Sequence, residues 1–519
     1  MIADIFNHFR GTDKNRFIKL TLSFYFVGFI VLLPFVVPFR YLLHFCLDDA
    51  YFYFKIANNI ALGKGSTFDG LNYTNGYHPL WLIILSGYYY ILNLINLTSP
   101  ILLVRFTFLL TSIINFFTLY YLYKSFKLFM DTDKSNQVFL LTSVLVIPSV
   151  LFNLIGLEIQ IYLLLIVLYN YLFSITDKKN KFVLNRGILL ALLSLARIDF
   201  IIFLIPGYFF FEYKKIDRNR FLLSIVLPVI VIYTTYLAFN FSNYGDIRTT
   251  SGYLSFSNFK LDSLPYSLKT FIIHPFRMLL LSITIITGGA YFIYIKKQLR
   301  LFSEATRYLL KLYEYFYCAG VVFLLFQILF NHDGAKEWYF ALSNFGGLLL
   351  FSFLPLLKIN HFNKLFIFPF IFSLIYFFPF RYYYYEFDDE YDYALLLKEK
   401  VNPSEYIFQF DYSGMISFYS ERKIVNGDGR VNSFYYINLY KQKVLNKYFK
   451  SIPISFYSTY AYKDLIYDES IIDTVYRDGI GGNVFQFPIN NLVLTKEKFK
   501  GGILSREKCL FYLIKVEEK

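Results

Sequence analysis

Long apolar segments recur throughout residues 17–380, and short clusters of lysine and arginine follow many of them. A run of about 20 apolar residues is the length of helix that crosses the hydrocarbon core of a bilayer. Hydrophobic residues make up 56% of the 519 residues, and the mean hydropathy is +0.45. Because soluble globular proteins are usually about 45–50% apolar even with glycine counted, most of this chain is expected to lie in a membrane.

The positions of the basic residues predict the orientation of the chain. The formal net charge is +14, which on its own would suggest a nucleic-acid partner. The lysines and arginines lie in short loops between apolar segments, however, as they do in the cytoplasmic loops of membrane proteins. We therefore expect no nucleic-acid partner, a cytoplasmic N-terminal segment at 1–16, and a multi-pass protein of the plasma membrane.

About eleven membrane crossings are predicted in the transmembrane module, residues 17–380. The first apolar segment, 17–45, is longer than a signal-peptide core and lacks a small-residue cleavage site, so it is expected to stay as an anchor. A crossing at 80–97 would place the next basic clusters outside, and we therefore predict a tilted or re-entrant segment there. The other crossings are predicted at 101–123, 137–155, 159–175, 182–196, 200–211, 221–241, 275–295, 312–330, 341–357 and 364–380.

The composition becomes polar from residue 381 onward. Strand-like runs at 406–410, 423–425 and 510–516 are separated by glycine, asparagine and aspartate, as in a small α/β or α+β domain. The number of crossings places this domain, 381–519, outside the cytoplasm. The Gly-Asp-Gly sequence at 427–429 is expected to be a turn, because no glycine-rich phosphate-binding motif surrounds it.

The first external loop, residues 46–80, opens with two adjacent carboxylates, Asp48 and Asp49. A charged pair at the edge of the hydrocarbon is costly, and it therefore suggests a functional site. The apolar residues that follow have the spacing of an amphipathic helix on the membrane surface, which Gly63 and Gly65 end. A structural alternative is that the pair only caps this helix.

Other polar and aromatic residues gather at the predicted external ends of the crossings. A transporter would more often carry ionisable residues near the middle of the bilayer, so this distribution favours a cavity at the outer leaflet, open to lipid and to water. The candidate substrate-binding residues are His78, Glu158, Arg197, Asp199, Arg248, Lys336, Trp338 and Tyr339.

Such a cavity suits glycosyl transfer from a sugar linked to a lipid phosphate. A hydroxyl acceptor is a poor nucleophile, so a carboxylate must take its proton, and we assign this role to Asp48 or Asp49. The departing polyprenyl phosphate needs cations or other donors, for which Arg248, His78 and Lys336 are candidates. A sugar with oxocarbenium character between them gains from nearby negative charge.

Each candidate also has a structural interpretation. His78 precedes a proline and is about as compatible with a loop hydrogen bond. Glu158, Arg197 and Asp199 would be explained equally well by salt bridges within the bundle, and the pair Trp338–Tyr339 by an interfacial anchor. No cofactor is required. A divalent cation held by the acidic pair, Glu158 and His78 stays open, although their spacing matches no metal-ligand pattern.

Four segments resemble a known family. The sequence 48–81, which begins DDAYFYF and ends NGYHPLW, together with GLEIQ at 156–160, LARID at 195–199 and EWYF at 337–340, is similar to motifs of GT-C glycosyltransferases. The similarity is to the bacterial arabinofuranosyltransferase-like branch, whose donors are polyprenyl-phosphate sugars. In this superfamily the first acid of the pair is generally the base, so the resemblance favours Asp48. Related proteins often carry a lysine after the motif at Ser251–Gly252, and here Arg248 replaces it by position only.

The sequence therefore predicts an inverting glycosyltransferase with a GT-C-like fold. It would use a polyprenyl-phosphate-linked sugar donor and a glycan, lipid or protein acceptor outside the cytoplasm. The alternatives are a transporter or flippase of lipid-linked sugars, for which internal repeats would be expected and none is found, and a non-catalytic membrane scaffold that presents the C-terminal domain.

Overall fold

The computed structural model describes residues 32–151, 154–175, 182–257, 275–331, 335–357, 387–409, 412–442 and 444–461, together with Tyr25, Gly28, Ile371 and short strands between 476 and 515. Residues 17–24, 26–27 and 29–31 of the predicted crossing at 17–45 lie outside these residues. The predicted crossing at 364–380 lies outside them except for Ile371.

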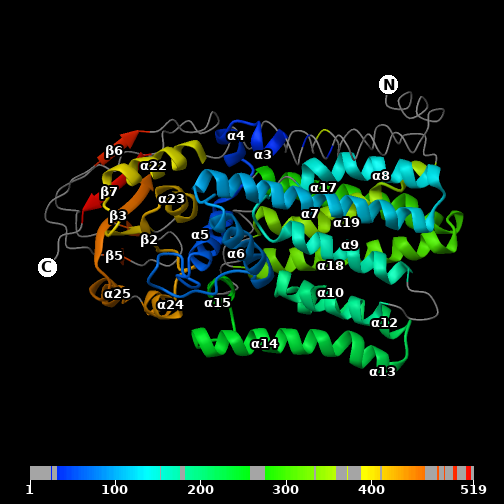
Figure 1. Ribbon diagram of the computed structural model, residues 1–519. Helices are drawn as coiled ribbons and strands as arrows, with labels where there is room; N and C mark the ends of the chain where they lie inside the picture. The colour runs from blue at the N-terminus through cyan, green and yellow to red at the C-terminus, as the bar shows by residue number, and fades with distance from the viewer. Residues whose placement is uncertain are drawn as a thin grey trace.

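A bundle of long helices forms the larger part of the molecule (Figure 1). Among the described residues, six helical stretches are long and apolar enough to cross a membrane, and each spans 20 to 30 residues. They are α7 (Pro100–Phe129); α8 (Thr132–Val146) with η2 (Ile147–Leu151); α13 (Arg218–Arg220), η3 (Phe221–Val226) and α14 (Leu227–Tyr244); α17 (Pro275–Ala290), η5 (Tyr291–Ile295) and η6 (Lys296–Leu301); α18 (Glu304–Phe330); and η7 (Glu337–Phe340), α19 (Ala341–Phe351) and η8 (Leu354–Leu357).

Four shorter apolar helices complete the described bundle. They are α6 (Pro79–Leu94), α9 (Ile159–Ile175), α10 (Val183–Ala196), and the stretch that contains α11 (Phe200–Phe203) and α12 (Ile205–Tyr213). The helices α11 and α12 are separated by a break at Leu204. At 1.5 Å per residue, the 16 residues of α6 extend about 24 Å, less than the ~30 Å hydrocarbon core. This length is compatible with the predicted tilted or re-entrant segment, which stays a prediction.

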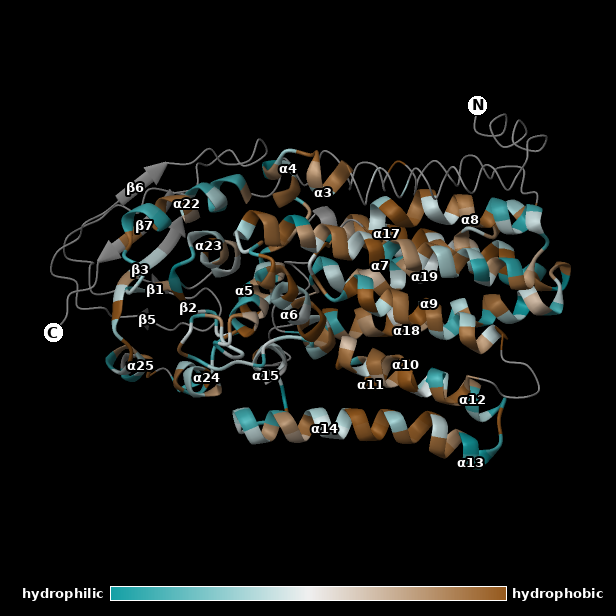
Figure 2. Cartoon of the chain, in the orientation of Figure 1, coloured by the Kyte–Doolittle hydropathy of each residue, from teal (hydrophilic) through white to brown (hydrophobic). Residues whose placement is uncertain are grey.

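The bundle exposes hydrocarbon to its surroundings. Figure 2 shows hydrophobic residues along α14 and hydrophilic ones at α13 and over much of α22. In the most apolar 18-residue segment of the Arg218–Tyr244 stretch, only 11% is buried inside the protein. Since such a surface would be unfavourable in water, it is the surface that lipid covers.

Glycine allows the bundle helices to approach one another closely. A Cβ atom at Gly187 of α10 would lie 1.9 Å from the carbonyl oxygen of Ser224 in η3. A Cβ atom at Gly320 of α18 would lie 2.6 Å from the amide nitrogen of Ser343 in α19. Small residues at such contacts let membrane helices gain van der Waals packing, the main attraction between helices in lipid.

A buried ion pair joins three helices at one end of the bundle. In α10, the Arg186 guanidinium donates hydrogen bonds of 2.6 and 2.7 Å to the Glu212 carboxylate of α12. The Tyr169 hydroxyl of α9 donates a third, 2.8 Å long, to the same carboxylate. All three side chains are fully buried, so the hydrogen bonds compensate a charge that would otherwise be very costly in this position.

The C-terminal domain contains a mixed five-stranded sheet with the order β2-β1-β3-β7-β6. The strands β1 (Tyr406–Gln409), β2 (Lys423–Asn426) and β3 (Ile454–Ala461) are parallel, whereas β7 (Leu510–Lys515) is antiparallel to β3 and to β6 (Thr495–Lys498). A separate two-stranded sheet pairs β4 (Tyr476–Arg477) with β5 (Val484–Phe485). The accompanying helices are α22 (Phe387–Lys400), α23 (Ser413–Ser420), α24 (Phe434–Lys441) and α25 (Asn446–Ser451).

Short helices near the start of the chain connect the two parts. They are α3 (Leu33–Phe35), α4 (Phe39–Leu43) and α5 (Asp48–Ala61). Arg40 of α4 forms a bidentate ion pair with Asp392 of α22, with the shorter contact at 2.6 Å. The helix α5 packs against both α6 and α23. The predicted fold class, a polytopic helical membrane protein with a small C-terminal α/β domain, is confirmed, while the number of eleven crossings stays a prediction.

We expect the buried ion pair to be sensitive to the loss of one partner. The substitution Glu212→Leu leaves the Arg186 charge uncompensated and should lower the free energy of unfolding by about 3–5 kcal/mol. The double variant Arg186→Leu/Glu212→Leu should recover most of this loss, because no lone charge stays buried. Denaturant titration in detergent micelles measures both.

The matched control is Lys134→Leu in an exposed ion pair with Asp131, whose side chains are 58% and 55% exposed. It should change the free energy by no more than about 1 kcal/mol. Equal effects of Lys134→Leu and Glu212→Leu would contradict the importance of the buried pair.

Candidate active site

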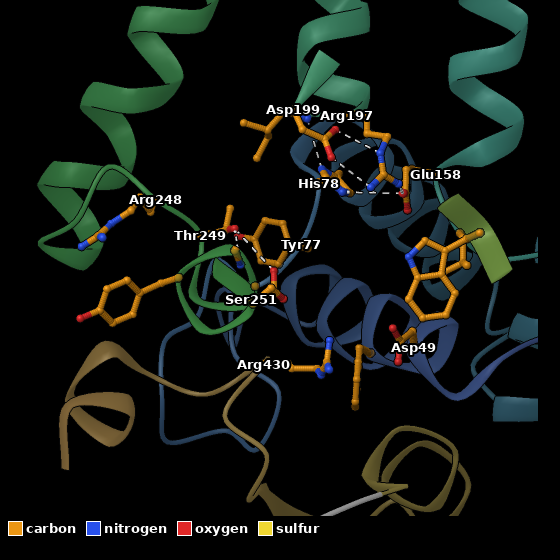
Figure 3. A pocket seen from close by; sticks show the side chains of 18 of the residues that line it. Asp49, Tyr77, His78, Glu158, Arg197, Asp199, Arg248, Thr249, Ser251 and Arg430 are labelled. Carbon is orange, nitrogen blue, oxygen red and sulfur yellow. Dashed lines mark hydrogen bonds and ion pairs between the residues drawn. The ribbon is translucent and has the colours of Figure 1, made fainter. Parts of the chain in front are cut away.

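A cavity of about 560 Å³ lies where the helix bundle meets the C-terminal domain. The walls come from α5, the loop before α6, α11, α14, α15 (Thr250–Ser257), the turn η7 and the loop that precedes α24. The residues that carry its chemistry are Asp49, Tyr53, His78, Glu158, Arg197, Asp199, Arg248, Tyr253, Gln327, Trp338, Tyr339 and Arg430. Figure 3 shows His78, Glu158, Arg197 and Asp199 together on one side and Asp49 and Arg430 on the other.

The two adjacent aspartates have different surroundings. Both belong to the first turn of α5, where neighbouring side chains point about 100° apart because a helix has 3.6 residues per turn. Asp49 lines the cavity. Within the described part of the chain, Asp48 does not line it. Its carboxylate accepts hydrogen bonds from the amide nitrogens of Gly414 (3.2 Å) and Met415 (2.7 Å) at the start of α23.

A buried charged network forms the side of the cavity nearest the bundle. The Arg197 guanidinium donates a 2.7 Å hydrogen bond to Glu158 and lies 3.1 Å from the Asp199 carboxylate. The Tyr53 hydroxyl donates to the other Glu158 oxygen at 3.1 Å. Glu158 and Arg197 are nearly fully buried, whereas about a quarter of the Asp199 side chain is exposed. Asp199 is therefore the carboxylate of this network that a ligand can reach.

His78 is held as a neutral imidazole at the edge of the network. Its Nδ1 atom accepts a hydrogen bond from the amide of Ile198 at 3.3 Å, and its Nε2 atom lies 3.7 Å from Glu158. Burial, and then the positive charge of Arg197, lowers the pKa of His78 to about 3. At neutral pH the ring therefore offers an Nε2–H donor, not a positive charge.

Arg248 and Tyr253 lie at a different part of the cavity wall. The Arg248 side chain forms a bidentate ion pair with Asp246, at 2.9 and 2.6 Å, and is 55% exposed. Its guanidinium carbon is 4.2 Å from the centre of the Tyr253 ring, and the Lys441 ammonium is 3.4 Å from the same centre. Burial and the nearby Arg248 lower the pKa of Lys441. Two cations thus contact one aromatic ring, and the Asp246 carboxylate compensates the charge of Arg248.

Three segments that are distant in sequence meet at Gly76. The Asn75 side chain donates to the carbonyl oxygen of Arg248 at 2.9 Å, and the Thr250 hydroxyl donates to the carbonyl oxygen of Arg430 at 2.8 Å. A Cβ atom at Gly76 would lie 1.8 Å from that Arg430 oxygen. Only glycine fits here, and its absence of a side chain lets the first external loop contact the C-terminal domain.

The aromatic pair of the EWYF motif is part of the cavity wall. Trp338 and Tyr339 both line it, and the Tyr339 ring lies 5.2 Å from the guanidinium carbon of Arg197. Lys336, which precedes them, does not line the cavity within the described residues. Its predicted contact with a phosphate therefore has no support from this geometry.

The structure brings together eight of the ten predicted site residues, all except Asp48 and Lys336. The sequence analysis missed Arg430 and Tyr253. Tyr253 directly follows the Ser251–Gly252 motif, and this motif could have indicated that it belongs to the site. Arg430 follows the Gly-Asp-Gly turn, and nothing near it in the sequence indicates a contact more than 300 residues away.

The proposed alternative of a divalent cation can be tested against the side chains. No group of three or more His, Cys, Asp or Glu residues that could hold a metal ion occurs among the described residues. Asp48 binds amides of α23, and Glu158 binds Arg197 and Tyr53. The four suggested ligands, Asp48, Asp49, Glu158 and His78, therefore do not form one metal site.

Comparison with known proteins gives a match at the level of the fold. No family model and no curated protein matches the chain. Among solved structures, the crystal structure of ArnT from Cupriavidus metallidurans bound to undecaprenyl phosphate is similar, with a TM-score of 0.55 and 9% sequence identity over 96% of this chain and 98% of that chain. The resemblance to GT-C glycosyltransferases is thus confirmed for the fold, and activity has to be argued from the site.

The neutral state of His78 predicts how stability depends on pH. An unfolded chain binds a proton to histidine below about pH 6.5, while the folded protein does so only near pH 3. Folding is therefore expected to lose stability as pH falls through this range, by up to about 1.4 kcal/mol per pH unit. The substitution His78→Asn keeps an acceptor for Ile198 and cannot be protonated.

Thermal unfolding of both proteins in detergent between pH 4 and 7.5 measures this effect. The melting temperature of the wild type should fall more steeply with decreasing pH than that of His78→Asn. Parallel curves would contradict the neutral state of the imidazole.

Proposed function

We propose that the chain is an inverting glycosyltransferase that moves a sugar from a polyprenyl-phosphate donor to a glycan, lipid or protein acceptor outside the cytoplasm. The observation that carries this proposal is the composition of the cavity, which joins the Asp49 carboxylate to the guanidinium groups of Arg248 and Arg430 beside an apolar wall. A base, cations and an apolar surface are what this reaction needs in one place. ArnT, which shares the fold, is described as bound to undecaprenyl phosphate, and this supports a carrier of that kind.

The apolar wall supports access from the membrane. It is formed by Ile201 and Ile202 of α11 and by Tyr233 and Leu237 of α14. Ile202 is 69% exposed, so the wall reaches the outer surface of the bundle, which lipid covers. A prenyl chain can lie along this surface while its phosphate enters the cavity.

In the proposed reaction the acceptor hydroxyl attacks the anomeric carbon of the donor sugar. The new carbon–oxygen bond forms as the bond to the phosphate oxygen breaks, and its electron pair leaves with the polyprenyl phosphate. Asp49 takes the hydroxyl proton as general base. Arg248 and Arg430 donate hydrogen bonds to the departing phosphate. A single displacement inverts the configuration at the anomeric carbon.

The charged network is proposed to hold the sugar. Asp199 and His78 have side chains that are about one-quarter exposed, so a carboxylate acceptor and an imidazole donor are available to sugar hydroxyls. The single guanidinium of Arg197 faces two carboxylates, Glu158 and Asp199. This excess of negative charge favours a sugar with oxocarbenium character, while Trp338 offers an aromatic face for stacking.

The arrangement of basic turns supports an extracytoplasmic C-terminal domain. Lys127 lies in the last turn of α7, and Lys215 follows α12 and donates to the carbonyl oxygen of Phe173 at the end of α9. Figure 1 shows the ends of α7 and α12 at the end of the bundle away from the C-terminal sheet. By the positive-inside rule, that end faces the cytoplasm of a plasma-membrane protein.

A donor panel tests the proposal directly. The purified protein in lipid nanodiscs is incubated with a set of undecaprenyl-phosphate sugars and a mixed acceptor extract, and release of undecaprenyl phosphate is followed by mass spectrometry. Release that depends on the acceptor supports a transferase. Movement of an intact undecaprenyl-phosphate sugar across proteoliposomes without release would instead identify a transporter.

We expect Asp49→Asn to lower the turnover number by about 10²- to 10⁴-fold, the usual contribution of a general base. Asp133→Asn, an exposed residue of α8 outside the cavity, is the matched control and should keep normal turnover. Both variants should show the same thermal unfolding as the wild type. Normal transfer by Asp49→Asn would exclude this carboxylate as the base.

Arg430→Gln is expected to weaken the binding of undecaprenyl phosphate about 10- to 100-fold, because it removes charge-assisted hydrogen bonds worth about 1.5–3 kcal/mol. Surface plasmon resonance on nanodisc-embedded protein, with undecaprenyl phosphate supplied in vesicles, measures the affinity. Lys336→Gln serves as the control cation outside the cavity and should bind like the wild type. Unchanged affinity in Arg430→Gln would remove this residue from the phosphate site.

A further inference from the structure

The helices α5 and α23 lie against each other and are joined by charges at both ends of α23. At its start, the Asp48 carboxylate accepts hydrogen bonds from the amides of Gly414 and Met415. At its end, the Lys55 ammonium donates to the carbonyl oxygens of Ser417 (3.0 Å) and Arg422 (3.4 Å).

This arrangement complements the dipole of α23. The first amides and the last carbonyls of a helix have no partner within it, and they carry partial positive and negative charge. A carboxylate at the first end and an ammonium at the second are each favourable. Asp48 and Lys55 are two turns apart in α5, about 10.5 Å, which matches the ~12 Å length of the eight residues of α23. Asp48 and Lys55 together are called the α23 clamp below.

The rest of this α5 face also contacts α23. Tyr51 lies between the two clamp residues on the same face. The Tyr51 hydroxyl accepts a hydrogen bond from Tyr419 at 3.2 Å, and its ring packs against that of Phe418. The neighbouring face of α5 presents Asp49 and Phe52 to the cavity. One helix thus holds the C-terminal domain with one face and lines the cavity with the next.

The contact between α5 and α23 leaves no room for a side chain at position 414, in the first turn of α23. A Cβ atom at Gly414 would lie 2.4 Å from the carbonyl oxygen of Asp48 and 2.7 Å from its carboxylate. The carboxylate of Asp48 is therefore fitted against the backbone of α23.

From α23 a short series of hydrogen bonds leads to Arg430. The Asn426 side chain, at the end of β2, donates to the hydroxyl of Ser413 in the first turn of α23 at 2.8 Å. The same Asn426 accepts from the amide of Val431 at 3.4 Å, and its carbonyl oxygen accepts from Asn432 at 2.8 Å. The loop that carries Arg430 is thus tied to the start of α23.

We propose that Asp48 and Lys55 are positioning residues, which fix Arg430 of the C-terminal domain in place opposite Asp49 by clamping α23 onto α5. This inference rests on the proposed function for its effect on transfer. It assigns the two adjacent aspartates separate tasks: Asp49 acts on the acceptor, and Asp48 sets the distance between the base and the phosphate-binding cation.

A double-mutant cycle on binding tests the clamp without depending on catalysis. Undecaprenyl phosphate affinity is measured for the wild type, Asp48→Ala, Arg430→Gln and the double variant in nanodiscs. Asp48→Ala should weaken binding about tenfold in the wild-type background and much less when Arg430 is already replaced, because residues of one network couple. Additive losses would overturn the positioning role.

Conservative and steric variants supply the second measurement. Asp48→Asn keeps an oxygen acceptor for the α23 amides, so it should retain at least a tenth of the wild-type transfer rate with an unchanged pH profile. Asp48→Ala and Gly414→Ala should lower the rate further and raise KM for the donor. Gly87→Ala, where a Cβ atom meets nothing within 4 Å, is the control. Asp48→Asn as inactive as Asp49→Asn would make Asp48 the base itself and overturn the inference.

Hydrogen exchange separates this inference from the proposed function. If no undecaprenyl-phosphate sugar is consumed and undecaprenyl phosphate does not bind, the proposed function fails. The clamp then still predicts faster amide exchange at Gly414, Met415 and the Arg430 loop in Asp48→Ala and Lys55→Met, and not in Asp49→Asn. If the amide exchange rates of these residues in Asp48→Ala and Lys55→Met equal those of the wild type, the proposed clamp is overturned.

Discussion

The helix α5 contacts the helix bundle on one side and the C-terminal domain on the other. The hydrogen bonds of its charged residues Asp48 and Lys55 therefore determine where the other parts of the site lie. The helix follows the first predicted crossing, packs on α6, lines the cavity and binds both ends of α23. Ion pairs and hydrogen bonds at the boundary of the hydrocarbon are strong because little water competes for them. A shift of α5 would therefore move both Asp49, the proposed base, and the C-terminal domain.

Charge compensation explains how so many ionisable residues are kept beside lipid. Arg197 is buried between Glu158 and Asp199, and Arg248 is paired with Asp246. Removing one partner from either of these ion pairs would leave an uncompensated charge in a medium that solvates it poorly. The cavity also joins groups from the two parts of the chain, since Asp49 belongs to α5 and Arg430 to the C-terminal domain, so the position of that domain bears directly on the proposed chemistry.

The sequence predicted most of the fold because membrane helices are specified by length and hydrophobicity, and α7, α14 and α18 have both. Eight of the ten residues that it named for the site line the cavity, since polar residues at helix ends stand out in an apolar chain. It favoured Asp48 as the base through the family resemblance, whereas Asp49 is the aspartate of the pair that lines the cavity. That depends on where the helix begins, and α5 begins at Asp48 itself, so the two side chains point in different directions. Arg430 could not be predicted at all, because its place depends on the packing of β2 and α23 and on the contact with Gly76.

The resemblance to ArnT at 9% identity follows from the same physics. A lipid-facing position such as those on α14 accepts any apolar side chain, so the bundle can change its sequence almost completely and keep its architecture. Glycines at close backbone contacts have no such freedom. Gly76 and Gly414 are the points where a bundle loop meets the backbone of the C-terminal domain and where that domain meets Asp48, and a Cβ atom at either would overlap the opposite chain. These two backbone contacts therefore help to fix where the C-terminal domain, with Arg430, lies relative to α5, with Asp49.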